Sequence, residues 1–303
     1  MNLEINNEVG ARFKLVARKA STGEITRETD WFQNIVLDTG LAQMSSGVWI
    51  DRCCVGTGNS TPVVTQTQLD AFKASTTSIQ GAVASGMQLT TLPYYDWLRV
   101  TYRFGEGIAA GNISEVGLGW ANANMWNRAL VKDANGNPTT ITVLSDEYLD
   151  VITEIRVYPQ ETLSGSFNFL NKAGAIVSSH TYTGRAYHTA PQRYHTKIGI
   201  DSIGIYSGAM SSSPTAGPSF SGRLDYGAPT TTTYPTPSSI QCTKKFPIAN
   251  AIGEHRTLFV ESTFLSAGSG MGYQVEFTPS IIKTNQMELT YTVSMSWGRY
   301  TGA

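Results

Sequence analysis

Alternation of apolar and polar residues is the dominant pattern along this chain. Residues 98–104, 149–158 and 288–297 each place an apolar side chain at every second position, which is the period of a strand with one buried face. Strand signals of this kind outnumber helix signals in both halves of the chain. The pattern predicts a mainly β protein, built from antiparallel β-sandwich-like domains with long loops and one or two short helices.

One helix is expected at about residues 66–75. Leu69, Ala71 and Phe72 would share an apolar face there, and Thr65 or Thr67 could cap the first turn. Residues 41–48 leave two alternatives open, a short helix or an extended segment. A different signal, Asn135-Gly136 between two β-rich runs, predicts a hairpin with a type I′ turn.

The position of a strand-ending proline predicts two domains. Pro159 ends a long alternating strand, so we place an N-terminal β domain at residues 1–160 and a second β domain at 161–303. The second domain contains a segment at 211–239 that is dense in Pro, Ser, Thr and Gly. Because it holds few apolar residues, we expect it to be ordered only against another chain or a neighbouring domain.

Charge limits the partners that the chain can hold. Charged residues make up 15% of the sequence, and the formal net charge is −1, so the overall field does not favour nucleic acid or an anionic membrane. We expect no nucleic-acid partner and no membrane insertion. A surface rich in Gly, Ser and Thr indicates contact with neighbouring subunits, and a secreted or lectin-like β protein is the alternative.

No enzyme chemistry emerges from the motifs, and we predict no catalytic, cofactor-binding or metal-binding residues. The glycines at 105, 107 and 111 lack the spacing of a nucleotide loop and predict a tight turn instead. Asp146, Glu147 and Asp150 form an acidic cluster, which we interpret as a solvated turn or interface ion pairs. The four histidines show no paired acid in the sequence; His188 and His195 could form a metal site, but exposed loop histidines are the default expectation.

Aromatic clusters supply the candidate binding residues. Tyr and Trp are enriched in interface cores and also stack on sugar rings. We predict that a subunit interface is formed by Tyr94, Tyr95, Trp97, Trp120 and Trp126. Two alternatives stay open: Trp120 and Trp126 could belong to the core, and the clusters could bind carbohydrate.

Four segments in residues 10–160 carry a resemblance to a known family. They are an F-x-N-x-V-x-D-x-G-L run from Phe32 to Leu41, V-G-T-G-N at 55–59, N-I-S-E-V-G at 112–117 and R-A-L at 128–130. In this order and spacing they resemble structural proteins of tailed bacteriophages, of the tail-fibre, baseplate or tail-tip kind.

The resemblance implies a non-catalytic virion protein that is assembled in the host cytoplasm. It would work as an oligomer, with copies of itself and other tail proteins as partners, and it would contribute to host attachment, with a host-surface glycan as a further candidate partner. The alternatives are a head-decoration or neck protein and a carbohydrate-binding receptor module. Residues 161–303 carry no part of the resemblance.

Overall fold

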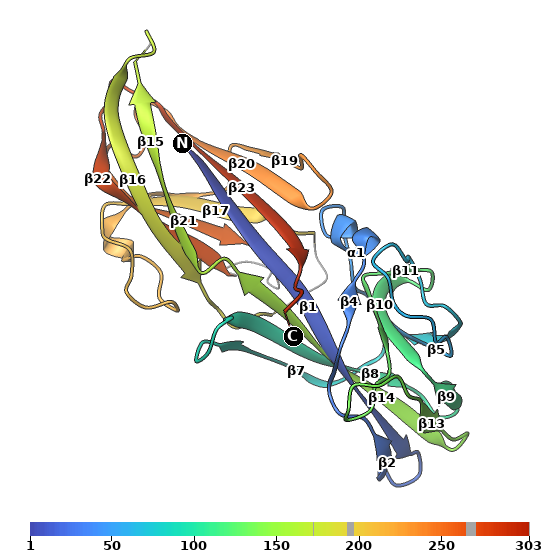
Figure 1. Ribbon diagram of the computed structural model, residues 1–303. Helices are drawn as coiled ribbons and strands as arrows, with labels where there is room; N and C mark the ends of the chain where they lie inside the picture. Colours follow the sequence, from blue (N-terminus) through green and yellow to red (C-terminus); the bar gives the residue numbers. More distant parts are fainter. Residues whose placement is uncertain (172, 193–196, 265–270, 303) are drawn as a thin grey trace.

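The fold is mainly β, which confirms the predicted class. A computed structural model describes residues 1–171, 173–192, 197–264 and 271–302. Strands dominate and pair in antiparallel sheets, and the one α-helix is short. Figure 1 shows an elongated molecule in which β1 (Asn2–Lys19) runs from one end to the other.

The largest sheet has the order β19-β20-β23-β1-β14-β8-β7, with β2 and β3 also paired to β1. All its pairs are antiparallel except β1 with β23. Its strands besides β1 are β2 (Ile25–Glu28), β3 (Phe32–Gln33), β7 (Ile79–Gln88), β8 (Tyr95–Phe104), β14 (Glu147–Pro159), β19 (Thr231–Thr233), β20 (Ser239–Phe246) and β23 (Leu289–Arg299).

Two further sheets of six strands accompany it, with a two-stranded pair of β9 (Gly111–Ile113) and β13 (Ile141–Val143). One sheet contains β4 (Ile35–Val36), β5 (Arg52–Gly56), β6 (Phe72–Thr76), β10 (Glu115–Ala121), β11 (Asn124–Met125) and β12 (Asn127–Leu130). The other contains β15 (Thr162–Leu170), β16 (Ile176–Tyr187), β17 (Ile200–Tyr206), β18 (Arg223–Gly227), β21 (Gly253–Ser262) and β22 (Gly272–Lys283).

A single hydrophobic cluster links the three large sheets. It includes Val55 of β5, Val151 of β14 and Val275 of β22, all fully buried. The largest sheet also takes strands from both sides of residue 160, since β1 pairs with β14 and β23 along successive parts of its length. The division into two domains at residue 160 stays a prediction, but the central sheet belongs to both halves.

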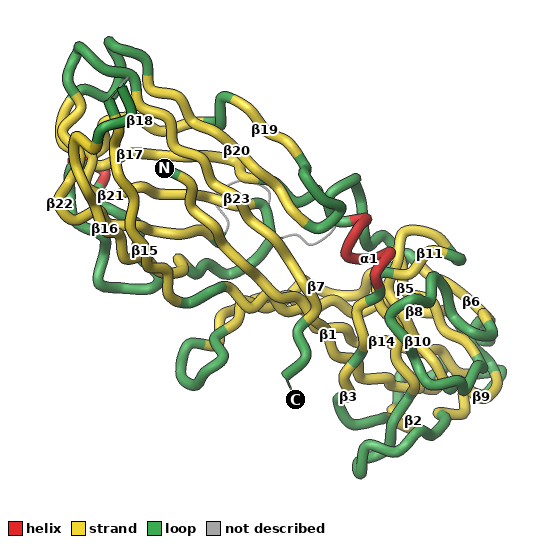
Figure 2. Tube along the Cα trace, turned by 45° about the horizontal axis from the view of Figure 1, so that its top comes forward, coloured by secondary structure: helices red, strands yellow, loops and turns green. Residues whose placement is uncertain are grey.

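The helix prediction at residues 66–75 is wrong. That stretch contains turns followed by β6, and the helix α1 spans Asp38–Gln43, where Figure 2 shows it between the two ends of the molecule. The carbonyl of Thr67 accepts a hydrogen bond from Met125, and that of Ala71 accepts one from Thr57. These contacts between distant segments replace the local bonds that a helix would need.

The Asn135-Gly136 turn is confirmed, but its type I′ geometry is wrong. Gly136 has a φ of +81°, whereas Ala251 is the only non-glycine with positive φ among the described residues. The Asp133 carboxylate accepts the backbone N–H groups of Asn135 and Asn137, each at 2.9 Å. The flanking strands β12 and β13 pair with other strands, and a lone bridge joins residues 132 and 138.

The segment 211–239 is ordered against its own half of the chain, so the expectation that it needs another chain or domain is wrong. It contains the 3₁₀ turn Phe220–Gly222, β18, β19 and the start of β20. Gln274 of β22 binds the segment's backbone through the N–H of Ser211 at 3.0 Å and the carbonyl of Ala216 at 2.7 Å. Polar side chains of the sheet thus order a segment that has little apolar surface.

Candidate functional site

Trp126, one of the predicted interface residues, lies in the core. Its side chain is 0% exposed, its ring centroid lies 5.0 Å from that of Trp49, and its Nε1 lies 3.4 Å from the sulfur of Met44. The interface prediction is therefore wrong for Trp126, and the core alternative holds. Trp120, at the end of β10, is partly buried against the main cluster, and its interface role stays a prediction.

Tyr95 and Trp97 lie on the outer face of the largest sheet. Alternate residues of β8 point into the core, which leaves Tyr95 and Trp97 half-buried on the opposite side. Trp97 packs over Gly86 of β7, where an added Cβ would come within 2.7 Å of the indole. Tyr94 lies just before the strand, and its ring packs edge-to-face with that of His188, with the ring centroids 6.3 Å apart. The structure thus brings Tyr95 and Trp97 together on one surface.

Arginine and aromatic side chains share this outer face, which we call the arginine–aromatic face. The register places Arg12 of β1, Glu154 of β14 and Arg99 of β8 in one row across the three strands. The ring of Trp31 covers that row, 4.5 Å from the Arg12 guanidinium and 5.2 Å from that of Arg99. The face comprises Arg12, Arg18, Trp31, Tyr95, Trp97, Arg99, Arg103, Tyr148, Asp150, Glu154 and Arg156.

The acidic cluster near residue 146 is held by ion pairs within the chain. Asp146 binds Lys19 at the exposed end of β14. Glu147 is buried and lies 3.1 Å from the Arg27 guanidinium; burial opposes its ionisation, but hydrogen bonds from Leu144, Thr26 and Arg27 outweigh that effect and lower its pKa. Asp150 likewise binds Arg103 at 2.7 Å. The interpretation as a solvated turn fits Asp146 alone. The carboxylates of Glu147 and Asp150 form ion pairs within the chain.

Three of the four segments that carry the family resemblance meet at the buried carboxylate of Glu115, and the fourth, residues 32–41, pairs through β4 with β12 beside it. Its two oxygens accept hydrogen bonds from the backbone N–H groups of Gly58, Asp70 and Ala71, at 2.8 to 3.0 Å. The Arg128 guanidinium donates to the same carboxylate at 2.8 Å, and both side chains are 0% exposed. A buried ion pair with this many further hydrogen bonds holds its charge at low cost.

Glycines in the same segments leave room for this arrangement. A Cβ on Gly56 or Gly58 would lie 2.5 Å from an oxygen of Glu115, and one on Gly40 would lie 2.2 Å from the carbonyl oxygen of Trp126. The sequence offered the glycines and Glu115 as motif residues, but it gave no sign that one carboxylate connects them. Non-local contacts of this kind become visible once the strands are paired.

His188 contradicts the expectation that the histidines lack paired acids. It is buried, with Nδ1 2.9 Å from Asp96 and Nε2 3.4 Å from Glu161. Burial alone would lower the pKa of His188, but the two carboxylates outweigh it and raise the pKa to about 9. Burial also raises the pKa of Asp96. The charged imidazole joins β8 to the segments around β15 and β16; His195 lies outside the described residues.

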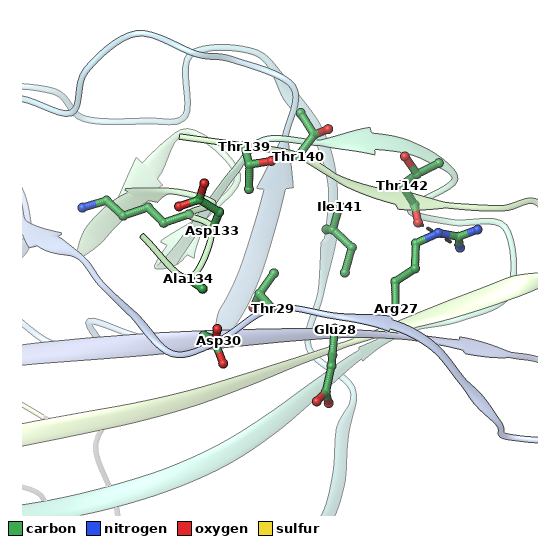
Figure 3. Close-up of a pocket in the computed structure, with 11 residues that line it drawn as sticks. Arg27, Glu28, Thr29, Asp30, Asp133, Ala134, Thr139, Thr140, Ile141 and Thr142 are labelled. Carbon is green, nitrogen blue, oxygen red and sulfur yellow. Dashed lines mark hydrogen bonds between the residues drawn. The ribbon is translucent and has the colours of Figure 1, made fainter. Parts of the chain in front are cut away.

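The surface pockets lined by the described residues are open to solvent. One pocket of about 340 Å³ lies between residues 27–30 and 132–142, and Figure 3 shows the Glu28 side chain pointing away from the labelled residues 133–142. Glu28 instead pairs with Lys14 at 3.1 Å. Within the described residues, no three His, Cys, Asp or Glu side chains are arranged to hold a metal ion, and no helix there has the length and apolar character needed to cross a bilayer.

The free edge of β7 is the second notable surface. Within the described part of the chain β7 pairs with β8 alone, so its outer row of N–H and C=O groups is open. Residues 74–95 contain no charged side chain, and Ile79, Val83 and Met87 are exposed. Natural proteins usually protect such edges with charge or proline, although β7 does carry a bulge between Gln80 and Ala84.

Comparisons of this chain with protein-family models, with curated proteins and with solved structures find no match.

Proposed function

We propose that this chain is a non-catalytic structural subunit of a bacteriophage tail, at the tail tip, the baseplate or the fibre attachment, and that it works by oligomeric assembly. The observation that carries the proposal is the meeting of three of the four resembling segments at Glu115, with the fourth paired to β12 through β4. Residues from V-G-T-G-N, N-I-S-E-V-G and R-A-L touch one carboxylate or each other. The resemblance thus rests on residues that build one structural unit rather than on scattered matches.

The free edge of β7 supports the assembly part of the proposal. An open row of backbone groups can add a strand from a neighbouring subunit. The uncharged residues around it remove the repulsion that would keep two copies apart. Other copies of this chain and other tail proteins are the partners that we propose.

Immunogold labelling of virions with antibody to the purified chain tests this function. We expect gold particles on the tail, and light scattering of the purified chain should give a mass above that of one subunit. Label on the head would instead support a decoration or neck protein. Particles that carry no label would contradict the virion proposal altogether.

The arginine–aromatic face favours a carbohydrate-binding module as a second candidate function. Its rings and guanidinium groups lie on a sheet surface away from the Glu115 unit. The two candidates are compatible, because a tail subunit can also hold a ligand of the host surface.

A further inference from the structure

The arginine–aromatic face carries a chemistry that assembly through β7 does not require. We propose that this face binds an acidic polysaccharide, with guanidinium groups on the carboxylates of the glycan and aromatic rings on its sugar rings. This inference goes beyond the proposed assembly and does not depend on it, because it concerns a face of the sheet rather than its edge.

Three arginines present a free guanidinium edge. Arg12 binds Glu154 through Nε and Nη2 at 2.8 and 3.1 Å, and Arg103 binds Asp150 through the same two nitrogens at 2.7 and 2.8 Å. Arg99 uses Nε and Nη2 on Glu154 as well. A guanidinium has five donors in a fixed fork, so the Nη1 edge of each has no acceptor among the described residues and is left for a ligand. These side chains are 27–37% exposed.

Charge on the face is positive although the whole chain is not. Five guanidinium groups share the two carboxylates Asp150 and Glu154, whereas the chain has a net charge of −1. Burial opposes ionisation of Glu154, but hydrogen bonds from Arg12, Arg99 and Arg156 outweigh it and lower its pKa. The carboxylates fix the guanidinium groups in place without neutralising them, which favours an anionic ligand.

Aromatic rings lie beside the same guanidinium groups. Arg103 lies 4.1 Å from the ring centre of Tyr148, Arg156 lies 4.2 Å from that of Tyr95, and Arg99 lies 5.1 Å from that of Trp97. These contacts order long side chains before any ligand arrives. Tyr and Trp present flat apolar surfaces with a polar edge, which suits the ring of a sugar.

The spacing of the charges favours a glycan over a nucleic acid. Arg99 and Arg103 are four residues apart on β8, which is about 13 Å along a strand. Duplex DNA carries about one charge per 1.7 Å, a spacing far closer than that of these two arginines. In an acidic polysaccharide each carboxylate is attached to a sugar ring, so rings and charges occur side by side, as the aromatic rings and guanidinium groups do on this face.

Binding of polygalacturonate to the purified full chain tests the inference, with neutral dextran and inorganic polyphosphate as comparison probes. We expect binding of polygalacturonate that weakens with salt, and no binding of dextran. Arg99→Gln, Arg103→Gln and Trp97→Ala should each weaken binding by about ten-fold. Because Glu154 and Asp150 keep other arginines, the two Arg variants leave no buried carboxylate unpaired.

Arg256→Gln is the matched control, since Arg256 forms an exposed ion pair with Glu276 on another sheet. It should bind like the unmodified chain, and all variants should keep the same oligomeric mass. The inference is overturned if polygalacturonate does not bind, if Arg256→Gln weakens binding as much as Arg99→Gln, or if polyphosphate binds as tightly and Trp97→Ala has no effect.

Discussion

At the scale of single residues, buried charged groups organise this protein as much as apolar ones. The Glu115 carboxylate gathers three backbone N–H groups from one loop region and the Arg128 guanidinium from β12. The loop that supplies these N–H groups, residues 57–71, is mostly polar, so hydrogen bonds to the carboxylate hold it in place. The contacts of Glu115 and Arg128 therefore indicate that these two motif residues have a structural role.

Replacement of Glu115 tests that role. Glu115→Ala leaves the Arg128 guanidinium buried with its main partner gone, and we expect a loss of about 3–5 kcal/mol in the free energy of unfolding. Urea denaturation followed by tryptophan fluorescence would measure it. The control is Glu288→Ala, which removes an exposed pair with Lys245 and should cost less than about 1 kcal/mol. Equal losses in the two variants would contradict the structural role.

His188 predicts a specific dependence of stability on pH. Its pKa in the folded protein is about 9, against about 6.5 for an unperturbed histidine, so the folded state binds the proton more tightly than the unfolded state. The stabilisation is complete below pH 6.5 and is lost as the pH rises through about 9. The chain should therefore lose up to about 3 kcal/mol relative to His188→Gln over that window.

Denaturation of both proteins at pH 6, 7.5 and 9 would show the difference. A stability difference between the chain and His188→Gln that stays constant across the three pH values would rule out the charged imidazole.

Replacement of Trp126 tests whether this residue stabilises the core or a subunit interface. Trp126→Ala removes a fully buried ring that packs on Trp49, and we expect it to destabilise the monomer by about 3–5 kcal/mol. Trp120→Ala, at a partly buried position, is the comparison and should cost less. Thermal unfolding and light scattering would be measured together. A Trp126→Ala variant with an unchanged melting temperature but poor assembly would support an interface role for this residue.

At the scale of elements, the sequence predicted those parts whose stability is local. Residues 98–104 and 149–158 alternate because β8 and β14 each bury one face, and both strands were predicted. The region 66–75 and the segment 211–239 were mispredicted because distant side chains, Glu115 and Gln274, hold their backbones. For the candidate surface, the sequence predicted Tyr95 and Trp97 as binding residues. It did not predict Arg12 and Glu154, which strand pairing places on the same face, or Trp31, which packs on the Arg12 guanidinium.

A charge at the free edge tests whether β7 mediates assembly. Val83→Lys places a cation beside the open backbone row, and we expect it to lower the oligomeric mass by blocking strand addition. Val48→Lys is the matched control, because both valines are 44% exposed but Val48 lies in a loop. Light scattering over a concentration series would decide. If the two variants associate alike, another surface holds the subunits together.

At the scale of the whole molecule, the largest sheet joins strands from both halves of the chain. β1 pairs with β14 over one part of its length and with β23 over another, and the hydrophobic cluster crosses between the sheets. We therefore expect calorimetry to show a single unfolding transition whose calorimetric and van't Hoff enthalpies agree. Two resolved transitions would support independent domains divided near residue 160.

The pairing of β1 with β23 also fixes when the protein can complete its folding. Asn6 and Ser296, which face each other in that pair, are 290 positions apart. The first strand leaves the ribosome long before its parallel neighbour exists, and it exposes alternate apolar side chains such as Leu3 and Ile5 in the meantime. Contacts of such sequence separation slow folding. We therefore expect this edge of β1 to stay unpaired until β23 has been synthesised, and an exposed strand edge of this kind favours binding to a chaperone.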